Sequence, residues 1–158
     1  MRNIVTALFL GVSFLNPISA SALTAHQTVN KVVEVKNEDG STAISYEPAN
    51  LVAPGEKVAY SLNIENDGGE PATDLVLTMP VPTEVKFVEG TAQKLGTTVS
   101  YSTDGGETYS DRIALRVITA DGRSRAAQSE DITHIRWKLS GPIDVGGSDI
   151  LSFQGILK

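Results

Sequence analysis

The sequence predicts an all-β protein, an immunoglobulin-like antiparallel β-sandwich of about seven to nine strands. Three observations support this fold class. Short apolar runs alternate with polar residues at a period of two, Gly, Pro, Asn and Asp separate these runs, and no segment has a helical period. The same pattern leaves a closed barrel as the alternative architecture.

The clearest strand pattern lies in residues 52–82. The turn at residues 54–55 opens a first strand, residues 66–69 close it, and a second apolar run follows at 75–79 before prolines stop it. One face of the first strand is apolar, at Val58, Tyr60, Leu62 and Ile64. The stretch is therefore predicted to be two strands of the scaffold rather than a chemical site.

Two shorter strands are expected before this stretch. Residues 23–28 form a polar lead-in, and residues 29–35 form a first strand. A turn at residues 37–40 precedes a second strand at 42–46, which ends before Pro48.

The C-terminal half continues the same alternation. Val85 and Phe87 lie on one face of a short strand, and residues 104–106 (Asp-Gly-Gly) predict a tight hairpin between a strand at 97–103 and the region after Thr108.

Three further elements complete the predicted sandwich. A strand with a shared apolar face is followed by a polar loop at residues 123–131. Residues 133–139 then carry Trp137, the natural core anchor, and residues 149–157 form the last strand. The apolar face of the first of these strands comprises Ile113, Leu115 and Val117.

Charge and cysteine content exclude several functions. Thirteen basic residues against 19 acidic ones give a net charge of −6. This balance argues against general binding to nucleic acid or to anionic lipid, both of which need a basic surface. The absence of cysteine excludes thiolate zinc sites and thiol catalysis, and leaves the core and sheet hydrogen bonds to stabilise the fold.

The N-terminus predicts export. Residues 1–22 combine a basic start, an apolar run too short to span a bilayer, and a small-residue cleavage site, so we expect a signal peptide cleaved after Ala22. A retained anchor is the alternative. No later segment approaches spanning length, and no anchor motif is recognised, so a periplasmic or secreted protein is expected. Residues 23–50 and 51–158 are expected to form one domain.

Five stretches in order also resemble a known family. They are residues 51–82, 85–92, 99–109, 133–147 and the closing strand at 149–157. Together they resemble the bacterial surface-repeat family catalogued as domain of unknown function eleven. The resemblance implies an immunoglobulin-like domain of the bacterial envelope or exterior, with no established activity to transfer. Because no second copy is found, this chain looks like a single-copy exported member.

The two histidines are weak candidates for catalysis. His26 lies in the polar lead-in, where a solvated side chain is the simpler interpretation. His134 shares the outward face of its strand with Arg136 and Lys138, opposite Ile135 and Trp137. No nucleophile elbow of Gly-x-Ser-x-Gly type accompanies it.

Acidic and basic clusters offer two binding hypotheses. Asp39, Asp67 and Asp104 lie in predicted turns, which explain them as turn residues, although they could meet at one end of a sandwich and bind a cation weakly. The late basic residues either form a patch for an acidic glycan or partner, or protect a sheet edge. These are Arg123, Arg125, His134, Arg136 and Lys138.

Two functions are compatible with these features. The first is a non-catalytic exported module that has a structural role or binds an envelope protein or glycan, with no metal or other cofactor. The alternative is a small metal-dependent or Ser/His hydrolase built around His134 on the same scaffold.

Overall fold

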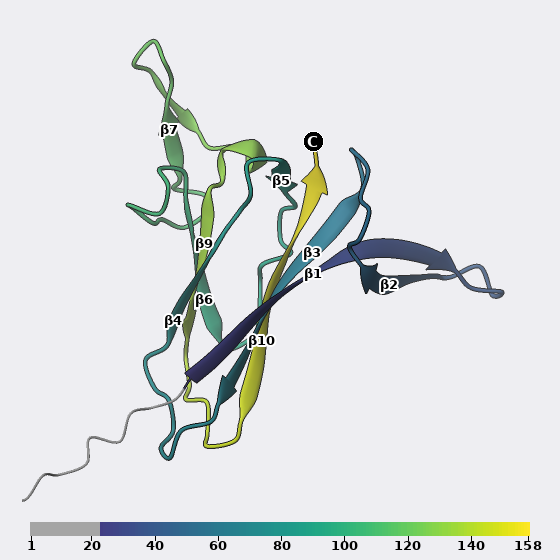
Figure 1. Cartoon of the computed structure of the whole chain (residues 1–158). Helices are drawn as coiled ribbons and strands as arrows, with labels where there is room; N and C mark the ends of the chain where they lie inside the picture. Colours follow the sequence, from purple (N-terminus) through teal and green to yellow (C-terminus); the bar gives the residue numbers. More distant parts are fainter. Residues whose placement is uncertain (1–22) are drawn as a thin grey trace, which may run out of the picture.

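The computed structural model describes residues 23–158, and Figure 1 shows its arrangement. Ten β-strands and one short 3₁₀ helix, η1 (Ser129–Asp131), lie in this range. The strands are β1 (Leu23–Lys36), β2 (Thr42–Pro48), β3 (Lys57–Asn66), β4 (Val76–Pro80), β5 (Val85–Phe87), β6 (Thr97–Ser102), β7 (Arg116–Ile118), β8 (Ser124–Ala126), β9 (His134–Leu139) and β10 (Ser148–Leu157).

The strands form two facing sheets and a separate hairpin. One sheet has the order β2-β1-β3-β10-β5, the other has the order β4-β9-β6, and β7 pairs with β8. Every pairing is antiparallel. The predicted all-β sandwich is therefore confirmed. The strand number exceeds the prediction because the polar loop expected at residues 123–131 contains a strand, β8, besides the helix η1.

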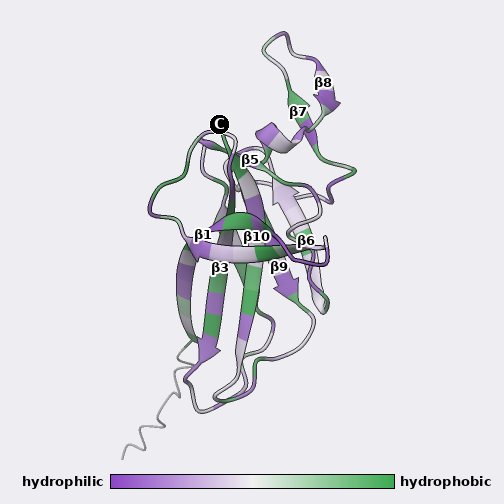
Figure 2. Cartoon of the chain, turned by 90° about the vertical axis from the view of Figure 1, so that its right-hand side faces the viewer, coloured by the Kyte–Doolittle hydropathy of each residue, from purple (hydrophilic) through white to green (hydrophobic). Residues whose placement is uncertain are grey.

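The core lies between the two sheets and is centred on Trp137, which is fully buried. The Trp137 indole Nε1 donates a hydrogen bond to the Ala92 carbonyl oxygen at 2.8 Å, so its polar group is satisfied. Phe153 stacks on Tyr60, with ring centroids 5.0 Å apart. The Phe87 ring is tilted against Phe153, with a centroid distance of 6.2 Å. Trp137 is thus the core anchor that the sequence predicted. Figure 2 shows apolar segments that alternate with polar ones along β3 and β10.

The N-terminal strand is twice as long as predicted, because residues 23–28 are part of β1 rather than a lead-in. This half of β1 pairs with β3, from Leu23 opposite Asn66 to Lys31 opposite Val58. Its side chains are mostly exposed, and only backbone pairing makes it a strand. A sequence pattern based on apolar alternation could not detect such a strand.

β1 exchanges partners along its length. After Lys31 it leaves β3 and pairs only with β2, up to Lys36 opposite Thr42. The β1–β2 hairpin consequently projects from the sandwich as an arm, seen at the right of Figure 1. We call residues 32–46 of this hairpin the arm.

Two predictions for residues 104–115 are wrong. Residues 104–106 do not form a tight hairpin, because β6 ends at Ser102 and the chain returns to its edge only at the bridge between Tyr101 and Ser110. Ile113 lies outside any strand and is 98% exposed, since the strand begins only at Arg116. Leu115 is buried as expected.

No helix within residues 23–158 is long and apolar enough to cross a membrane. The predicted signal peptide, residues 1–22, lies outside the described residues.

Candidate functional site

The structure does not place His26 in a site. It lies on the exposed part of β1, opposite Asn63 of β3. Its backbone oxygen accepts a 3.4 Å hydrogen bond from the Asn63 side chain. His26 therefore remains a surface residue of a strand rather than of a lead-in.

His134 lies at the start of β9, on the side of the sheet away from the core. Its ring Nδ1 is 3.3 Å from the Thr133 hydroxyl, and the backbone of Gly106 lies against the ring. Within the described range, no three His, Asp or Glu side chains are grouped closely enough to hold a metal ion. The surroundings of His134 thus contain a hydroxyl and a loop rather than an acid-base constellation.

The three acidic turn residues do not meet, so the alternative of a shared cation site is wrong and the interpretation as turn residues holds. Asp39 lies in the turn at the tip of the arm, where it accepts hydrogen bonds from Ser41. Asp67 lies in the turn after β3 and accepts a 2.8 Å hydrogen bond from Thr24. The third, Asp104, lies in the loop after β6. Strand connectivity places these turns in different parts of the molecule (Figure 1).

Asp104 organises its own loop. Its carboxylate accepts hydrogen bonds from the Thr108 amide and hydroxyl and a 2.7 Å bond from the hydroxyl of Ser102. Ser102 is fully buried and also accepts from the Gly106 amide at 2.9 Å. These bonds occupy Asp104 as a structural acceptor, which explains the Asp-Gly-Gly sequence without a bound ion.

The same bonds predict how the loop responds to acid. Hydrogen bonds from Thr108, and then from Ser102, lower the pKa of Asp104 well below its usual 3.8. Because the folded pKa is depressed, its contribution to stability is fully present above pH 3.8 and is lost as pH falls through the lowered value. An NMR titration of the Asp104 carboxyl carbon should show this midpoint. A midpoint at or above 3.8 would show that the loop bonds are absent.

The late basic residues divide into two groups. On the β7–β8 hairpin, Arg123 pairs with Asp121 at 3.2 Å, and Arg125 makes two hydrogen bonds to Asp131. The Arg125 hydrogen bonds are the main cause of the lowered pKa of Asp131. These arginines are neutralised locally and do not form one patch with β9.

The second group lies on the outward face of the small sheet. Arg136 of β9 sits between Thr78 of β4 and Ser100 of β6, and Lys138 sits between Val76 and Thr98. We call this surface the outer basic face, defined by Arg136, Lys138, Tyr109, Thr78 and Ser100. Within residues 23–158, no carboxylate forms an ion pair with Arg136 or Lys138.

Tyr109 holds the Arg136 side chain in place. The centre of the guanidinium lies 3.4 Å from the centroid of the Tyr109 ring. Such stacking fixes the guanidinium plane and adds cation-π attraction. The Nε of Arg136 is buried and lacks a partner in the described part of the chain, so the terminal nitrogens are the donors left for a ligand.

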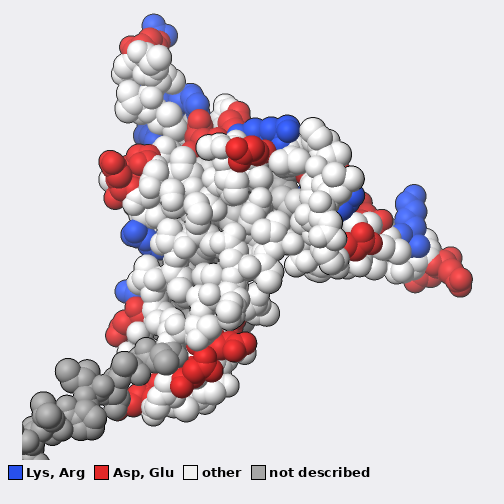
Figure 3. All heavy atoms as spheres, viewed as in Figure 1, with Lys and Arg blue, Asp and Glu red and all other residues white. Residues whose placement is uncertain are grey.

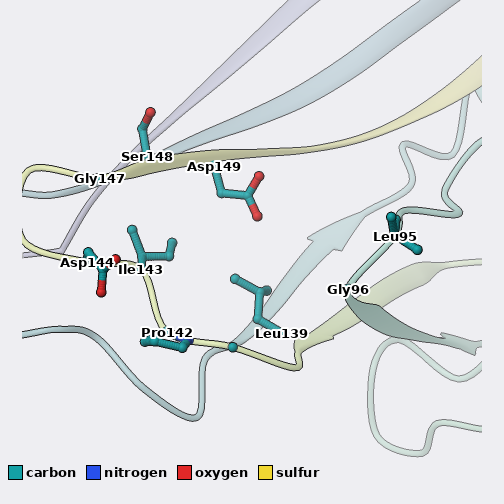
Figure 4. Close-up of a pocket in the computed structure, with 10 residues that line it drawn as sticks. Leu95, Gly96, Leu139, Pro142, Ile143, Asp144, Gly147, Ser148 and Asp149 are labelled. Atoms are coloured by element: carbon teal, nitrogen blue, oxygen red, sulfur yellow. The ribbon is translucent and has the colours of Figure 1, made fainter.

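A separate depression of about 350 Å³ lies at the side of the sandwich, between the start of β10 and the connection before β6 (Figure 4). Leu139 and Ile143 contribute apolar walls, and Asp149 points toward its interior. Lys94 pairs with Asp149 at 2.6 Å, which neutralises that carboxylate. Asp144 is a second carboxylate of the lining, and no group of three His, Asp or Glu side chains that could hold a metal ion forms there or elsewhere in residues 23–158.

The chain was also compared with known proteins. No family, no curated protein and no solved structure matches it. The resemblance to the surface-repeat family therefore stays a prediction.

The outward position of Arg136 and Lys138 was predicted from their alternation with Trp137. Tyr109 was missed as a site residue, because it comes from a loop whose return to the sheet depends on the Tyr101–Ser110 bridge. Thr78 and Ser100 were missed because sequence alone did not show which strands flank β9.

Proposed function

We propose that this protein is a non-catalytic exported module of the bacterial cell envelope that binds an acidic glycan through its outer basic face. The stacked Arg136, with no carboxylate partner in residues 23–158 of an otherwise acidic chain, is the observation that carries the proposal. The export signal and the envelope location rest on the sequence of residues 1–22.

The chemistry of the outer basic face suits a carboxylate-bearing sugar polymer. A guanidinium whose plane is fixed can donate two parallel hydrogen bonds to one carboxylate. Lys138 is exposed beside it on the same face and supplies a second positive charge. The hydroxyls of Thr78 and Ser100 flank Arg136 and can donate to or accept from sugar hydroxyls.

The surroundings of His134 favour binding over hydrolysis. Hydrolysis by a Ser/His pair needs a third group that orients the histidine, commonly a carboxylate. The His134 ring Nδ1 lies 3.3 Å from the hydroxyl of the neighbouring Thr133 rather than against a carboxylate. The hydrolase alternative therefore gains no support from the geometry.

Glycan binding can be tested by titrating the purified protein with a uronic-acid oligosaccharide and with a neutral oligosaccharide of equal length. Arg136→Gln should weaken binding to the acidic ligand by about 10- to 100-fold, because hydrogen bonds to charged groups are lost. Lys138→Gln should cause a smaller loss, and added salt should weaken binding further.

Arg123→Gln is the matched control. It removes the same charge from the chain, but from a side chain that is 85% exposed and already paired with Asp121. Its affinity should equal that of the unaltered protein. Equal losses in Arg123→Gln and Arg136→Gln, or equal binding of the neutral oligosaccharide, would reject the proposed site.

A further inference from the structure

The arm carries apolar side chains on both of its faces. Tyr46 lies opposite Val32 on one face, where Ile44 is its neighbour along β2. On the other face Val35 lies opposite Ala43. Ile44, Tyr46 and Val35 are 57%, 56% and 44% exposed. A two-stranded hairpin that projects into solvent gains nothing from such residues unless a partner covers them.

The outer edge of β2 is also unpaired. β2 is the last strand of the large sheet, and no strand of residues 23–158 lies beside it. At the hairpin end the Asn37 amide donates to the Ser41 carbonyl oxygen at 2.9 Å. Because hydrogen-bonded pairs alternate along an antiparallel ladder, residues 43, 45 and 47 bond to β1, whereas Ile44 and Tyr46 direct their backbone groups outward.

We propose that two copies of this chain pair through β2, antiparallel and about a two-fold axis at Ser45. In this register Ile44 of each copy lies opposite Tyr46 of the other. These are the residues with outward backbone groups, so the two pairs form about four hydrogen bonds between the chains. The two five-stranded sheets become one continuous sheet across the dimer.

The side chains of β2 fit this register. Ile44 and Tyr46 from both copies form one apolar cluster on the face that also carries Val32. Glu47, the one charged residue of β2, lies opposite Ala43 of the other copy, so no like charges face each other. If the register between the two β2 strands is shifted by two residues, Ile44 of one copy lies opposite Ile44 of the other and fewer residues of the two strands pair. The register centred on Ser45 is therefore favoured.

The other sheet edges are less suited to pairing. β5 has only three residues, and β4 ends in Pro80. The outer edge of β6 is partly occupied, because Ser110 forms a backbone bridge with Tyr101 there. Short strands, prolines and covering loops are common protections of an edge, and the central part of β2 has none of them. A second copy is favoured as occupant because the β2 sequence is complementary to itself, as a two-fold interface requires.

A single cysteine at the proposed axis tests the register. The chain contains no cysteine, so Ser45→Cys introduces the only thiol. In the proposed register residue 45 of one copy lies directly opposite residue 45 of the other, in a pair that makes no backbone hydrogen bonds. The two Cα atoms of such a pair are about 4.5 Å apart, which is within the range that a disulfide can bridge. Protein expressed from the full-length sequence should convert to a disulfide-linked dimer under mild oxidation. Ser124→Cys, on β8 and away from the proposed axis, should form no disulfide-linked dimer under the same oxidation.

A proline variant tests the edge hydrogen bonds. Tyr46→Pro removes an amide that points away from β1, so the arm is expected to fold while pairing between copies is lost. Sedimentation should give a concentration-dependent dimer for the unaltered protein and a monomer for Tyr46→Pro, with equal circular dichroism. A monomer at every concentration, or equal cross-linking of Ser45→Cys and Ser124→Cys, would overturn the proposal. A dimer that Tyr46→Pro leaves intact would overturn it as well.

The dimer test is independent of the glycan test. The arm and the outer basic face belong to different sheets and share no residue. Loss of pairing in Tyr46→Pro should leave the affinity per chain for a short acidic oligosaccharide unchanged, and Arg136→Gln should leave the dimer unchanged.

Discussion

Trp137→Ala is expected to lower the free energy of unfolding by about 3–5 kcal/mol, the usual loss when a large aromatic side chain is removed from a packed core. Trp137 is fully buried in the middle strand of the small sheet, and its indole nitrogen satisfies the Ala92 carbonyl oxygen. Truncation leaves both a cavity and an unpaired carbonyl. Denaturant titration followed by far-ultraviolet circular dichroism measures the change without needing the tryptophan signal.

Trp137→Phe separates the two parts of this effect. Phenylalanine fills much of the volume but cannot donate to Ala92, so an intermediate loss is expected. A loss below about 1 kcal/mol for Trp137→Ala would contradict the position of Trp137 in the core.

Asn66→Ala is expected to cost about 2–4 kcal/mol, because it leaves the Gly68 amide and the Glu70 carbonyl oxygen without their partner and removes one of the two hydrogen bonds to the Ile143 carbonyl oxygen. Asn66 is fully buried at the end of β3. Its side-chain nitrogen donates to the carbonyl oxygens of Glu70 at 2.9 Å and Ile143 at 2.8 Å, and its oxygen accepts from the Gly68 amide at 3.0 Å. One side chain thereby joins the β3–β4 turn to the segment before β10. Thermal and denaturant unfolding of the variant measure the loss.

Asn63→Ala is the control for this prediction. Asn63 lies three residues earlier on the same strand, and its side chain makes one long hydrogen bond of 3.4 Å to His26. Its truncation should change stability by less than about 0.5 kcal/mol. Similar losses at both positions would mean that Asn66 does not join the two segments.

The sequence predicted the strands that bury one face in the core, because apolar and polar side chains alternate along such strands. β3, β9 and β10 have one face on the core, so the alternation around Tyr60, Trp137 and Phe153 located them. β1 residues 23–28 and β8 escaped prediction, because backbone pairing rather than apolar side chains makes them strands. Asn66 shows the same limit, since its turn was predicted but its hydrogen bond to Ile143 spans 77 residues.

In the candidate site, too, positions along one strand could be predicted, whereas contacts between distant segments could not. Alternation along one strand sufficed to place Arg136 and Lys138 outward, but their grouping with Arg123 and Arg125 was wrong. Closeness in sequence does not bring residues together when the chain leaves the sheet to form the β7–β8 hairpin. Tyr109 joins the site through a loop whose path is set by the bonds of Asp104 and Ser102.

Charge is distributed unevenly over the surface. On the face of the molecule seen in Figure 3, charged side chains lie at the ends of the molecule and on the arm. The middle of this face is largely uncharged. A dimer that pairs through β2 and leaves the small sheet open would present two outer basic faces to one polymer. The affinity of the dimer for a long glycan that contacts both copies would then exceed the affinity of a single copy.

The most direct test of glycan binding is a backbone amide and arginine side-chain NMR titration of the protein with a short uronic-acid oligosaccharide. Shifts concentrated at Arg136, Lys138, Tyr109 and the facing positions Thr78 and Ser100 are the predicted result. Shifts that map instead to the Lys94–Asp149 depression, or no shifts at all at saturating oligosaccharide, would contradict a glycan site on the outer basic face.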